Sequence, residues 1–232
     1  MTRVAFLCCC LGFLPAVLAG PQADPTTSPT VRRLATNPII TPEMLPGKDG
    51  QNINGPSLVR VPAWLPNPLG KYYLYFANHH GTYIRLAYAD HLEGPWKIFA
   101  GGVLRLQDAP GAKGHIASPD VHVDAEKKEI RMYFHGPAKA ADGQMTFYSS
   151  SKDGRKFTAD AAPLCRSYLR AFRWDGWWYG IAKGGQLYRS QDGRAPFARG
   201  GNPLPSGTES DEPGNIHPRH VAVDLHGDTL RV

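Results

Sequence analysis

Cysteine is scarce in this sequence outside its first ten residues. Cys8, Cys9 and Cys10 lie there, and Cys165 is the only cysteine that follows. If the N-terminal segment is removed, no intrachain disulfide can form, so an exported domain must be large enough to be stabilised by apolar burial. No catalytic or metal-site motif surrounds Cys165, and we interpret it as a small buried apolar side chain rather than a nucleophile.

The sequence also lacks an apolar run long enough to cross a membrane as a helix. The longest run, residues 4–18, contains Pro15 and is shorter than the roughly 20 apolar residues that a spanning helix needs. It follows Met-Thr-Arg and precedes Ala19-Gly20, which is typical of a signal peptide. We therefore predict a signal peptide at residues 1–19, a secreted or periplasmic location, and no membrane span in the mature chain. A retained anchor is the less favoured alternative.

A concentrated patch of one charge is likewise missing. The 26 Lys and Arg exceed the 20 Asp and Glu by a net charge of +6, but the basic residues are scattered. A nucleic-acid-binding face would show a basic stripe with interleaved aromatic residues, so no nucleic-acid partner is expected. No His-x-x-x-His or comparable ligand spacing occurs either, and we expect no dedicated metal site and no other cofactor.

Short strands and turns fill most of the chain after a polar lead-in. Residues 21–38 are rich in Pro, Thr and Ser, and we predict an extended or disordered lead-in over residues 20–48. Within residues 49–232, the β-branched and aromatic runs predict strands at 57–61, 71–77, 83–89, from Pro119, at 129–135, 145–151, from Tyr168, at 177–182 and at 186–190.

These strands fall into repeated units. Asp-Gly-Arg turns begin at Asp153 and Asp192, 39 residues apart, each after an aromatic-polar strand and before a short strand containing Phe. A further unit begins near Pro218 and stops part-way into its second strand, at residues 229–232. Four-stranded repeats of this length are typical of β-propeller blades, because a lone four-stranded sheet cannot bury both faces. The prediction is an all-β propeller with about three and a half blades; a β-sandwich with repeated hairpins is the alternative.

The strand starts carry a family resemblance. Ser118-Pro-Asp-Val-His resembles the Ala-Pro-Asp-Val strand start in the second blade of glycoside hydrolase family 43, and Asn54-Gly-Pro-Ser-Leu-Val-Arg resembles its first-blade Asp-Pro-Ser start. Tyr72-Tyr-Leu-Tyr-Phe-Ala also matches the blade pattern, and the resemblance runs from about residue 50 to the end. It implies a member of the five-bladed group around families 43, 32 and 117. A closed five-bladed ring needs more strands, so we expect the chain to be C-terminally truncated.

The resemblance also implies where catalytic acids belong. The family places an Asp on the first blade, an Asp on the second and a proton-donating Glu on a later one. Only the second maps, onto Asp120, because Gly55 stands at the first position and the third blade reads Tyr168-Leu-Arg170-Ala, without an acid. This departure leaves open whether the chain is a hydrolase.

Other residues provide candidate acid, base and binding groups. Hydrolysis of a glycosidic bond needs one group that protonates the leaving oxygen and another that activates water or attacks. Asp120 enters a strand directly after Ser-Pro and faces a cavity in this prediction, although it could instead cap a turn. Glu212, in an acidic loop that could equally be solvated, and His217 are the candidate proton donors. An imidazole can act as an acid, a base or a metal ligand near neutral pH, or it can have a structural role. A cation bound on the propeller axis is a further alternative. The candidate substrate-binding residues are His79, His80, His115, Arg170, Arg219 and His220.

Two functions follow from these residues. The first is a secreted glycoside hydrolase acting on an oligo- or polysaccharide by carboxylate and histidine acid–base catalysis. The second is a catalytically silent propeller that binds carbohydrate or another partner, since a fold alone does not give a function. Four aromatic residues could stack on sugar rings, although packing between blades is the favoured interpretation. They are Trp174, Trp177, Trp178 and Tyr179.

Overall fold

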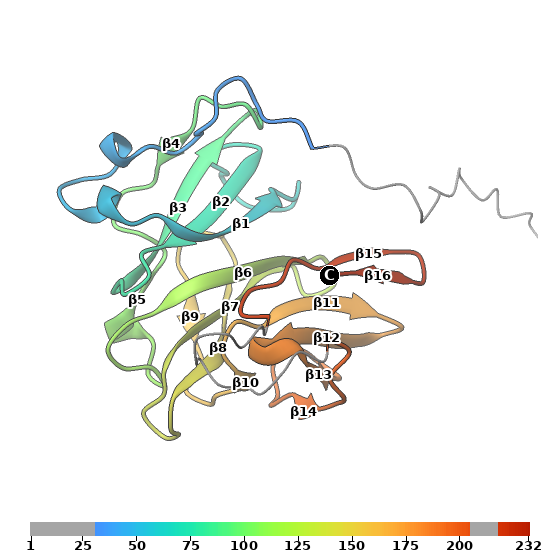
Figure 1. Cartoon of the computed structure of the whole chain (residues 1–232). Coiled ribbons are helices and arrows are strands. Elements are labelled where there is room, and N and C mark those ends of the chain that lie inside the picture. The colour runs from blue at the N-terminus through green and yellow to red at the C-terminus, as the bar shows by residue number, and fades with distance from the viewer. Residues whose placement is uncertain (1–30, 205–217) are drawn as a thin grey trace, which may run out of the picture. The chain divides into compact units, whose positions relative to one another are not determined.

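Antiparallel strands form nearly all the regular structure in the computed structural model, which describes residues 31–204 and 218–232 (Figure 1). By their internal contacts residues 33–232 form one unit, and residues 1–32 are assigned to another. The helical elements of the described residues are four single 3₁₀ turns: η1 (Pro42–Met44), η2 (Asp49–Gln51), η3 (Leu106–Asp108) and η4 (Lys183–Gly185). No helix in the described ranges is long and apolar enough to span a membrane. The predicted all-β class is confirmed.

The strands of the described residues form three successive sheets and a C-terminal hairpin. The first sheet has the order β1 (Asn54–Arg60), β2 (Tyr72–Ala77), β3 (Tyr83–Ala89), β4 (Lys97–Ile98), with β5 (Leu104–Arg105) also on β3. The second has β6 (Ala117–Asp124), β7 (Glu129–Pro137) and β8 (Gln144–Ser151), with β9 (Thr158–Ala159) and β10 (Cys165–Arg166) on β8. The third runs β11 (Arg170–Trp174), β12 (Trp177–Ala182), β13 (Gln186–Ser190), β14 (Ala198–Arg199). The hairpin pairs β15 (Asp224–His226) with β16 (Thr229–Arg231).

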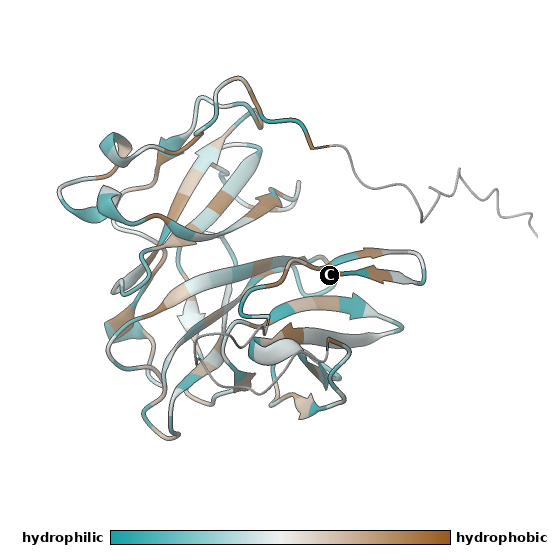
Figure 2. Ribbon diagram, viewed as in Figure 1, coloured by the Kyte–Doolittle hydropathy of each residue, from teal (hydrophilic) through white to brown (hydrophobic). Residues whose placement is uncertain are grey.

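Burial on both faces explains the aromatic composition of β2. Tyr73 and Tyr75 point into the large core shared with the second sheet, while Leu74 and Phe76 point to the opposite face. That opposite face is covered by Trp96 and by the segment before β1, where Leu45 is buried and its neighbours Ile39, Ile40 and Met44 pack alongside. The C-terminal part of the lead-in range 20–48 therefore packs on the first sheet. Figure 2 shows the more usual alternation of apolar and polar residues on β15 and β16.

The Asp-Gly-Arg turns repeat in structure as well as in sequence. The Asp153 carboxylate accepts the backbone N–H groups of Arg155 and Lys156 at 2.8 and 2.9 Å, and the Asp192 carboxylate accepts those of two equivalent residues at 2.9 and 2.8 Å. In each turn the glycine has φ of +69° and its carbonyl accepts a tyrosine hydroxyl from the preceding sheet at 2.8 Å. The donors are Tyr75 to Gly154 and Tyr133 to Gly193.

The start of the last strand pair differs from the sequence prediction. The fourth inner strand was expected to begin near Pro218, but the described residues 218–223 form no strand and β15 begins at Asp224. Pro218 has no backbone N–H for a ladder, and its carbonyl accepts the N–H of Gly184 in η4 at 2.8 Å. The segment is thus bonded to the third sheet before the hairpin begins.

Candidate functional site

Imidazole and phenol rings from distant parts of the chain form a continuous series. Each ring contacts the next one in the series. The distances between ring centroids are 4.5 Å from His79 to His80, 5.1 Å from His80 to His115, 6.4 Å from His115 to His135, 4.1 Å from His135 to Tyr168 and 4.3 Å from Tyr168 to His220. We call these six residues the histidine cluster. The cluster gathers three of the candidate residues from one end of the first two sheets and a fourth from the chain after the third sheet.

Strand ends explain why these residues meet. His79 and His80 lie in the turn between β2 and β3, and His115 precedes β6. The N–H of Ile116 donates to the carbonyl of Gly81 at 2.9 Å, which holds the segment before β6 against that turn. His135 faces Ala117 across the β6–β7 pair, so antiparallel pairing brings the end of β7 to the start of β6.

Burial, and after it the positive groups nearby, lowers the pKa values of four imidazoles in the cluster. Burial and, after it, the fields of His115 and His220 lower the pKa of His135 to about 3, and this side chain is 2% exposed. Burial together with neighbouring imidazoles or arginines also lowers the pKa of three other cluster members. They are His79, His115 and His220. At neutral pH these four rings are uncharged, so each can accept a hydrogen bond at its unprotonated nitrogen, although His135 is too weak a base to take up a proton there.

Tyr168 connects the histidine cluster to a cleft. Its backbone has φ of +64°, unusual for a residue with a bulky side chain, and its ring packs between His135 and His220. Its hydroxyl accepts a hydrogen bond from Arg219 at 3.0 Å, and the same guanidinium lies 5.4 Å from the ring centroid. The ring and hydroxyl are therefore held in one orientation.

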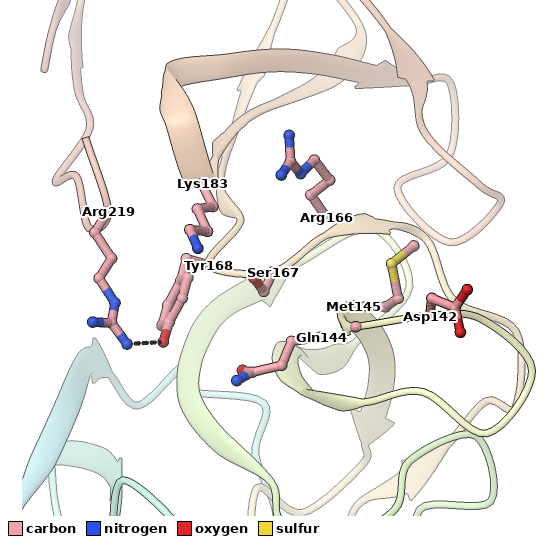
Figure 3. Close-up of a pocket in the computed structure, with 9 residues that line it drawn as sticks. Asp142, Gln144, Met145, Arg166, Ser167, Tyr168, Lys183 and Arg219 are labelled. Carbon is pink, nitrogen blue, oxygen red and sulfur yellow. Dashed lines mark hydrogen bonds between the residues drawn. The ribbon is translucent and has the colours of Figure 1, made fainter. Parts of the chain in front are cut away.

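The cleft beside Tyr168 has a volume of about 450 Å³ (Figure 3). Figure 3 shows Gln144, Lys183 and Arg219 on different sides of the Tyr168 ring. The walls of the cleft come from the β7–β8 turn, the end of β10, η4 and the segment that begins at residue 218. The lining residues are Asp142, Gly143, Gln144, Met145, Arg166, Ser167, Tyr168, Lys183 and Arg219.

Asp120 is bonded to the third sheet. Its Oδ2 accepts the backbone N–H of Ala171 at 2.8 Å and lies 2.9 Å from Nε2 of His122, and its Oδ1 lies 3.7 Å from the Arg170 guanidinium. Burial alone would raise the pKa of Asp120, but His122, Arg170 and the Ala171 N–H together outweigh it and lower that pKa. Asp120 is therefore an ionised acceptor at neutral pH, with its oxygens already engaged.

Ser57, the residue of the first sheet that is equivalent to Asp120, makes the same kind of hydrogen bond to the next sheet. The hydroxyl of Ser57 accepts the backbone N–H of Val121 at 2.9 Å, as Asp120 accepts that of Ala171. Both side chains follow a register irregularity and a left-handed residue, Gly55 or Ser118. The Asp120 position thus has a structural use that does not depend on catalysis.

A carboxylate has no room at Gly55, the position of the family's first-blade Asp. Its φ is +56°, and a Cβ there would lie 2.7 Å from Cα of Ser118 and 2.9 Å from its hydroxyl oxygen. Asp49, a nearby acid, instead hydrogen bonds Tyr83 and lies 3.4 Å from the buried Arg85. The described residues therefore do not provide the first-blade acid that the resemblance implies.

The other candidates are distributed as follows. Arg170 donates to the carbonyl of Pro119 at 2.9 Å. It is near enough to the histidine cluster for its charge to add to the effect of burial in lowering the pKa of His135 and His220. Arg219 contacts the cluster through Tyr168. Glu212 and His217 lie outside the described residues.

The four aromatic candidates fall into two groups. Trp178 is buried between the second and third sheets, near Tyr133 and His122. Trp174 and Trp177 are 46% and 36% exposed, and Tyr179 stacks on Phe172. None of the four lines the cleft beside Tyr168.

Sequence reasoning did not select several residues of the site. His135 was noted only as the end of a strand and Tyr168 only as the start of one, and Gln144 and Lys183 carried no motif. One sequence signal was available for Tyr168: it lies two residues before Arg170, as Gly55 and Ser118 lie two residues before Ser57 and Asp120. The structure adds that all three have positive φ. Aligning the repeats would have marked it.

Neither a reactive cysteine nor a metal-binding group of side chains is present among the described residues. Burial raises the pKa of the Cys165 thiol to about 12, which keeps it protonated. Among the described residues, no group of three or more His, Cys, Asp or Glu side chains is arranged to hold a metal ion. The cluster histidines thus contact one another ring to ring rather than converging on one point.

Comparison with solved structures identifies the architecture. The α-L-arabinofuranosidase CtGH43 of Clostridium thermocellum superposes with a TM-score of 0.53 at 19% identity, covering 76% of this chain and 58% of that one. The GH43_1 enzyme of Xanthomonas citri, in complex with xylose, gives 0.54 at 15% identity, covering 75% and 64%. The fold is that of β-propeller glycoside hydrolases. A putative glycoside hydrolase of Bacteroides ovatus gives 0.51 at 12% identity, covering 73% and 58%.

Sequence comparison finds a viral relative. The uncharacterised protein R118 of Acanthamoeba polyphaga mimivirus is 37% identical over an alignment of 185 residues, and the match covers 70% of this chain and 51% of that protein. The chain thus spans about half the length of this relative. No protein-family model matches the chain.

Proposed function

We propose that this protein is glycoside-hydrolase-like and binds an oligo- or polysaccharide at the histidine cluster and the adjoining cleft. The observation that carries the proposal is the continuous series of ring contacts that runs from His79 to His220 and brings side chains from distant parts of the chain together. A saccharide needs many hydrogen-bonding partners, and neutral imidazoles supply both a donor and an acceptor. The propeller hydrolase fold supports the carbohydrate class without naming the sugar.

If the protein is a hydrolase, we propose that imidazoles take over the role of catalytic carboxylates that the family resemblance implies and this chain lacks. The lowered pKa values of His115 and His220 leave these rings neutral and able to activate water as general bases. The proton for the leaving oxygen must then come from another group, and we propose Glu212 or His217 for it. Asp120 would orient the site through Arg170, because its carboxylate is already bonded to Ala171.

A catalytically silent carbohydrate-binding protein is the second candidate. It is favoured by Gly55, where Ser118 leaves no room for a side chain, and by the structural use of Asp120. The same cluster would then hold the ligand without bond cleavage. In either form we propose that residues 1–19 direct export, which N-terminal sequencing of the protein recovered from an expressing host would test.

The full chain should be assayed for both turnover and binding with a broad panel of glycosides and oligosaccharides. Hydrolysis that falls on the order of 10² to 10⁴-fold in His115→Asn or His220→Asn, with little change in affinity, would support the hydrolase. Binding that the same substitutions weaken, without turnover by the unmutated chain, would support the silent form. His91→Asn is the matched control, because His91 is exposed and outside the cluster. If no saccharide is bound or cleaved, the proposal is wrong.

A further inference from the structure

The contact between the first and second sheets repeats, in its backbone, the contact between the second and third sheets. At the first contact the N–H of Phe157 donates to the carbonyl of Val103 at 3.0 Å, and at the second the N–H of Phe197 donates to the carbonyl of Leu164 at 3.0 Å. Each of these phenylalanines follows one of the two Asp-Gly-Arg turns. The arginines of the two turns, Arg155 and Arg194, are therefore equivalent residues.

Phe99 at the first contact is equivalent to Asp160 at the second. The N–H of Phe99 donates to the carbonyl of Leu86 at 2.8 Å, and the N–H of Asp160 donates to the carbonyl of Tyr148 at 2.9 Å. Leu86 and Tyr148 correspond, because each pairs with the tyrosine whose hydroxyl bonds the glycine of the next Asp-Gly-Arg turn. An apolar ring thus stands in the first contact where the second has a carboxylate.

The two equivalent arginines differ in their partners for this reason. Arg194 donates from Nε and Nη2 to the two carboxylate oxygens of Asp160 at 2.7 and 2.9 Å, which is a bidentate ion pair. The Nε of Arg155 is buried and has no hydrogen-bond partner in the described part of the chain. Oδ2 of Asp153 lies 3.7 Å from this Nε, too far for a hydrogen bond. The first contact therefore has the guanidinium but not the carboxylate that binds it.

Burial makes this difference costly. The Arg155 side chain is 28% exposed, whereas that of Arg194 is 54% exposed. A guanidinium that is largely removed from water loses free energy for each N–H donor that finds no acceptor. An anionic oxygen group placed beside Arg155, as Asp160 is placed beside Arg194, would recover that free energy.

A cleft of about 480 Å³ lies beside Arg155 and has room for such a group. We call it the β5–β9 cleft, because residues of both strands line it. Arg105 and Lys156 add positive charge, and Asp108 is the one acid among the described lining residues. The volume is in the range of small-molecule sites and is several times that of a carboxylate group. The lining residues are Gly101, Gly102, Val103, Leu104, Arg105, Asp108, Arg155, Lys156, Phe157 and Thr158.

We propose that the β5–β9 cleft binds a small organic acid whose carboxylate lies beside Arg155 as the carboxylate of Asp160 lies beside Arg194. The carbon skeleton of the acid would occupy the rest of the cleft, where the Thr158 side chain can hydrogen bond its polar groups. Sulfate and phosphate esters present oxygens of the same kind, so the experiment must tell these anions apart. The site shares no residue with the histidine cluster or the cleft beside Tyr168, and the proposal does not rest on the carbohydrate function.

NMR of the ¹⁵N-labelled full chain tests the proposal through the Nε–H resonance of Arg155, assigned by triple-resonance experiments. The probes are galacturonate, its neutral methyl ester, galactose 6-sulfate and galactose 6-phosphate. We expect galacturonate to shift this proton downfield in a saturable way, because a charge-assisted hydrogen bond replaces water, and the ester to leave it unchanged. The sulfate and phosphate esters should bind at least about tenfold more weakly. Tighter binding of either one would overturn the assignment to a carboxylate.

The equivalent contact supplies matched variants. Arg155→Lys keeps the charge but loses the planar pair of donors, and it should weaken galacturonate binding about tenfold. Arg194→Lys is the control and should leave that binding unchanged, because Arg194 is already bound to Asp160. Asp160→Ala should create a second galacturonate site, seen as a downfield shift of the Arg194 Nε–H. Near-ultraviolet circular dichroism checks that each variant folds.

Two results would overturn the proposal. One is an Arg155 Nε–H resonance that no probe shifts, which is measured on the unmutated chain and so does not depend on any variant. The other is a loss of binding that is equal in Arg155→Lys and Arg194→Lys. Acetate that binds as tightly as galacturonate would show that the cleft takes a bare anion and not a larger acid. None of these results bears on the carbohydrate proposal, which the His115 and His220 variants test.

Discussion

The carboxylate of Asp120 and the backbone N–H of Ala171 are joined by a 2.8 Å hydrogen bond across the boundary between the second and third sheets. The equivalent bond one sheet earlier is made by a hydroxyl, that of Ser57. The site that most resembles a hydrolase catalytic acid is thus also a connection between sheets. Its substitution will report on stability and on function together, and the two must be separated.

Asp120→Ala is expected to destabilise the fold by about 3 kcal/mol. It leaves the Ala171 N–H without its acceptor and the partly buried Arg170 without its counter-charge. Asp120→Asn keeps an oxygen for the N–H and should cost less. Ser57→Ala, which removes a neutral acceptor, should cost about 1 kcal/mol. Urea denaturation of the three variants gives the comparison, and an Asp120→Ala variant as stable as Ser57→Ala would contradict the assigned role.

Gly55→Asp should not create a hydrolase. We expect it to destabilise the protein by more than 2 kcal/mol, because it combines a left-handed backbone with a Cβ that would lie 2.7 Å from Cα of Ser118. Gly143→Asp is the matched control, since Gly143 also has positive φ, +78°, but no atom within 4 Å of an added Cβ. Gly143→Asp should show the backbone strain alone, about 1 kcal/mol. Equal melting temperatures for the two variants would show that Ser118 is not an obstacle.

Local patterns predicted the strands because their causes are local. The run Tyr72-Tyr-Leu-Tyr-Phe-Ala forms β2 because both of its faces are covered, and each Asp-Gly-Arg turn forms because an Asp side chain caps the N–H groups that follow it. The proximity of His79, His80 and His115 could also be predicted from the sequence, because strand ends in repeated sheets lie together. These features depend on residues close in the sequence or on the repeat itself.

Contacts between sheets were beyond sequence reasoning. Whether Asp120 opens to a cavity or accepts a bond from Ala171 depends on how the next sheet is placed, which neither residue encodes by itself. The role of His135 depends in the same way on Tyr168, 33 residues later. The delayed start of β15 follows from the bond between Gly184 and the carbonyl of Pro218, a pairing with no local sequence signal.

Cys165 should be unreactive in the folded protein. Burial raises the pKa of its thiol to about 12, so the thiolate that reacts with disulfide reagents is nearly absent at pH 8. In a chain with Cys8, Cys9 and Cys10 replaced by Ser, modification by a coloured aromatic disulfide reagent should be slow in buffer and fast in denaturing urea. Rapid labelling without denaturant would show that the core around Cys165 is open.

Acidification between pH 6.5 and about pH 4 should destabilise the protein through His135. Its pKa falls from 6.5 to about 3 on folding, first through burial and then through neighbouring positive groups, so in this window the unfolded chain binds a proton that the folded chain does not. Stability is therefore full above pH 6.5 and decreases as pH falls, by about 1.4 kcal/mol per pH unit, or on the order of 2 kcal/mol at pH 5. The groups that face His135 and depress its pKa are His79, His115, Arg170 and His220.

Replacing His135 separates its contribution from those of its neighbours. His135→Phe keeps a ring against Tyr168, removes the unpartnered Nδ1 and should lower the pH slope by about one proton. Asp120 does not affect this window: its pKa lies below the ordinary value of 3.8, so its stabilisation is present above that pH and is lost only under stronger acid. Urea denaturation at half-unit pH intervals measures the slope. NMR titration of the His135 ring gives a second measure, and a resonance that titrates near pH 6.5 in the folded protein would show that the cluster does not depress its pKa.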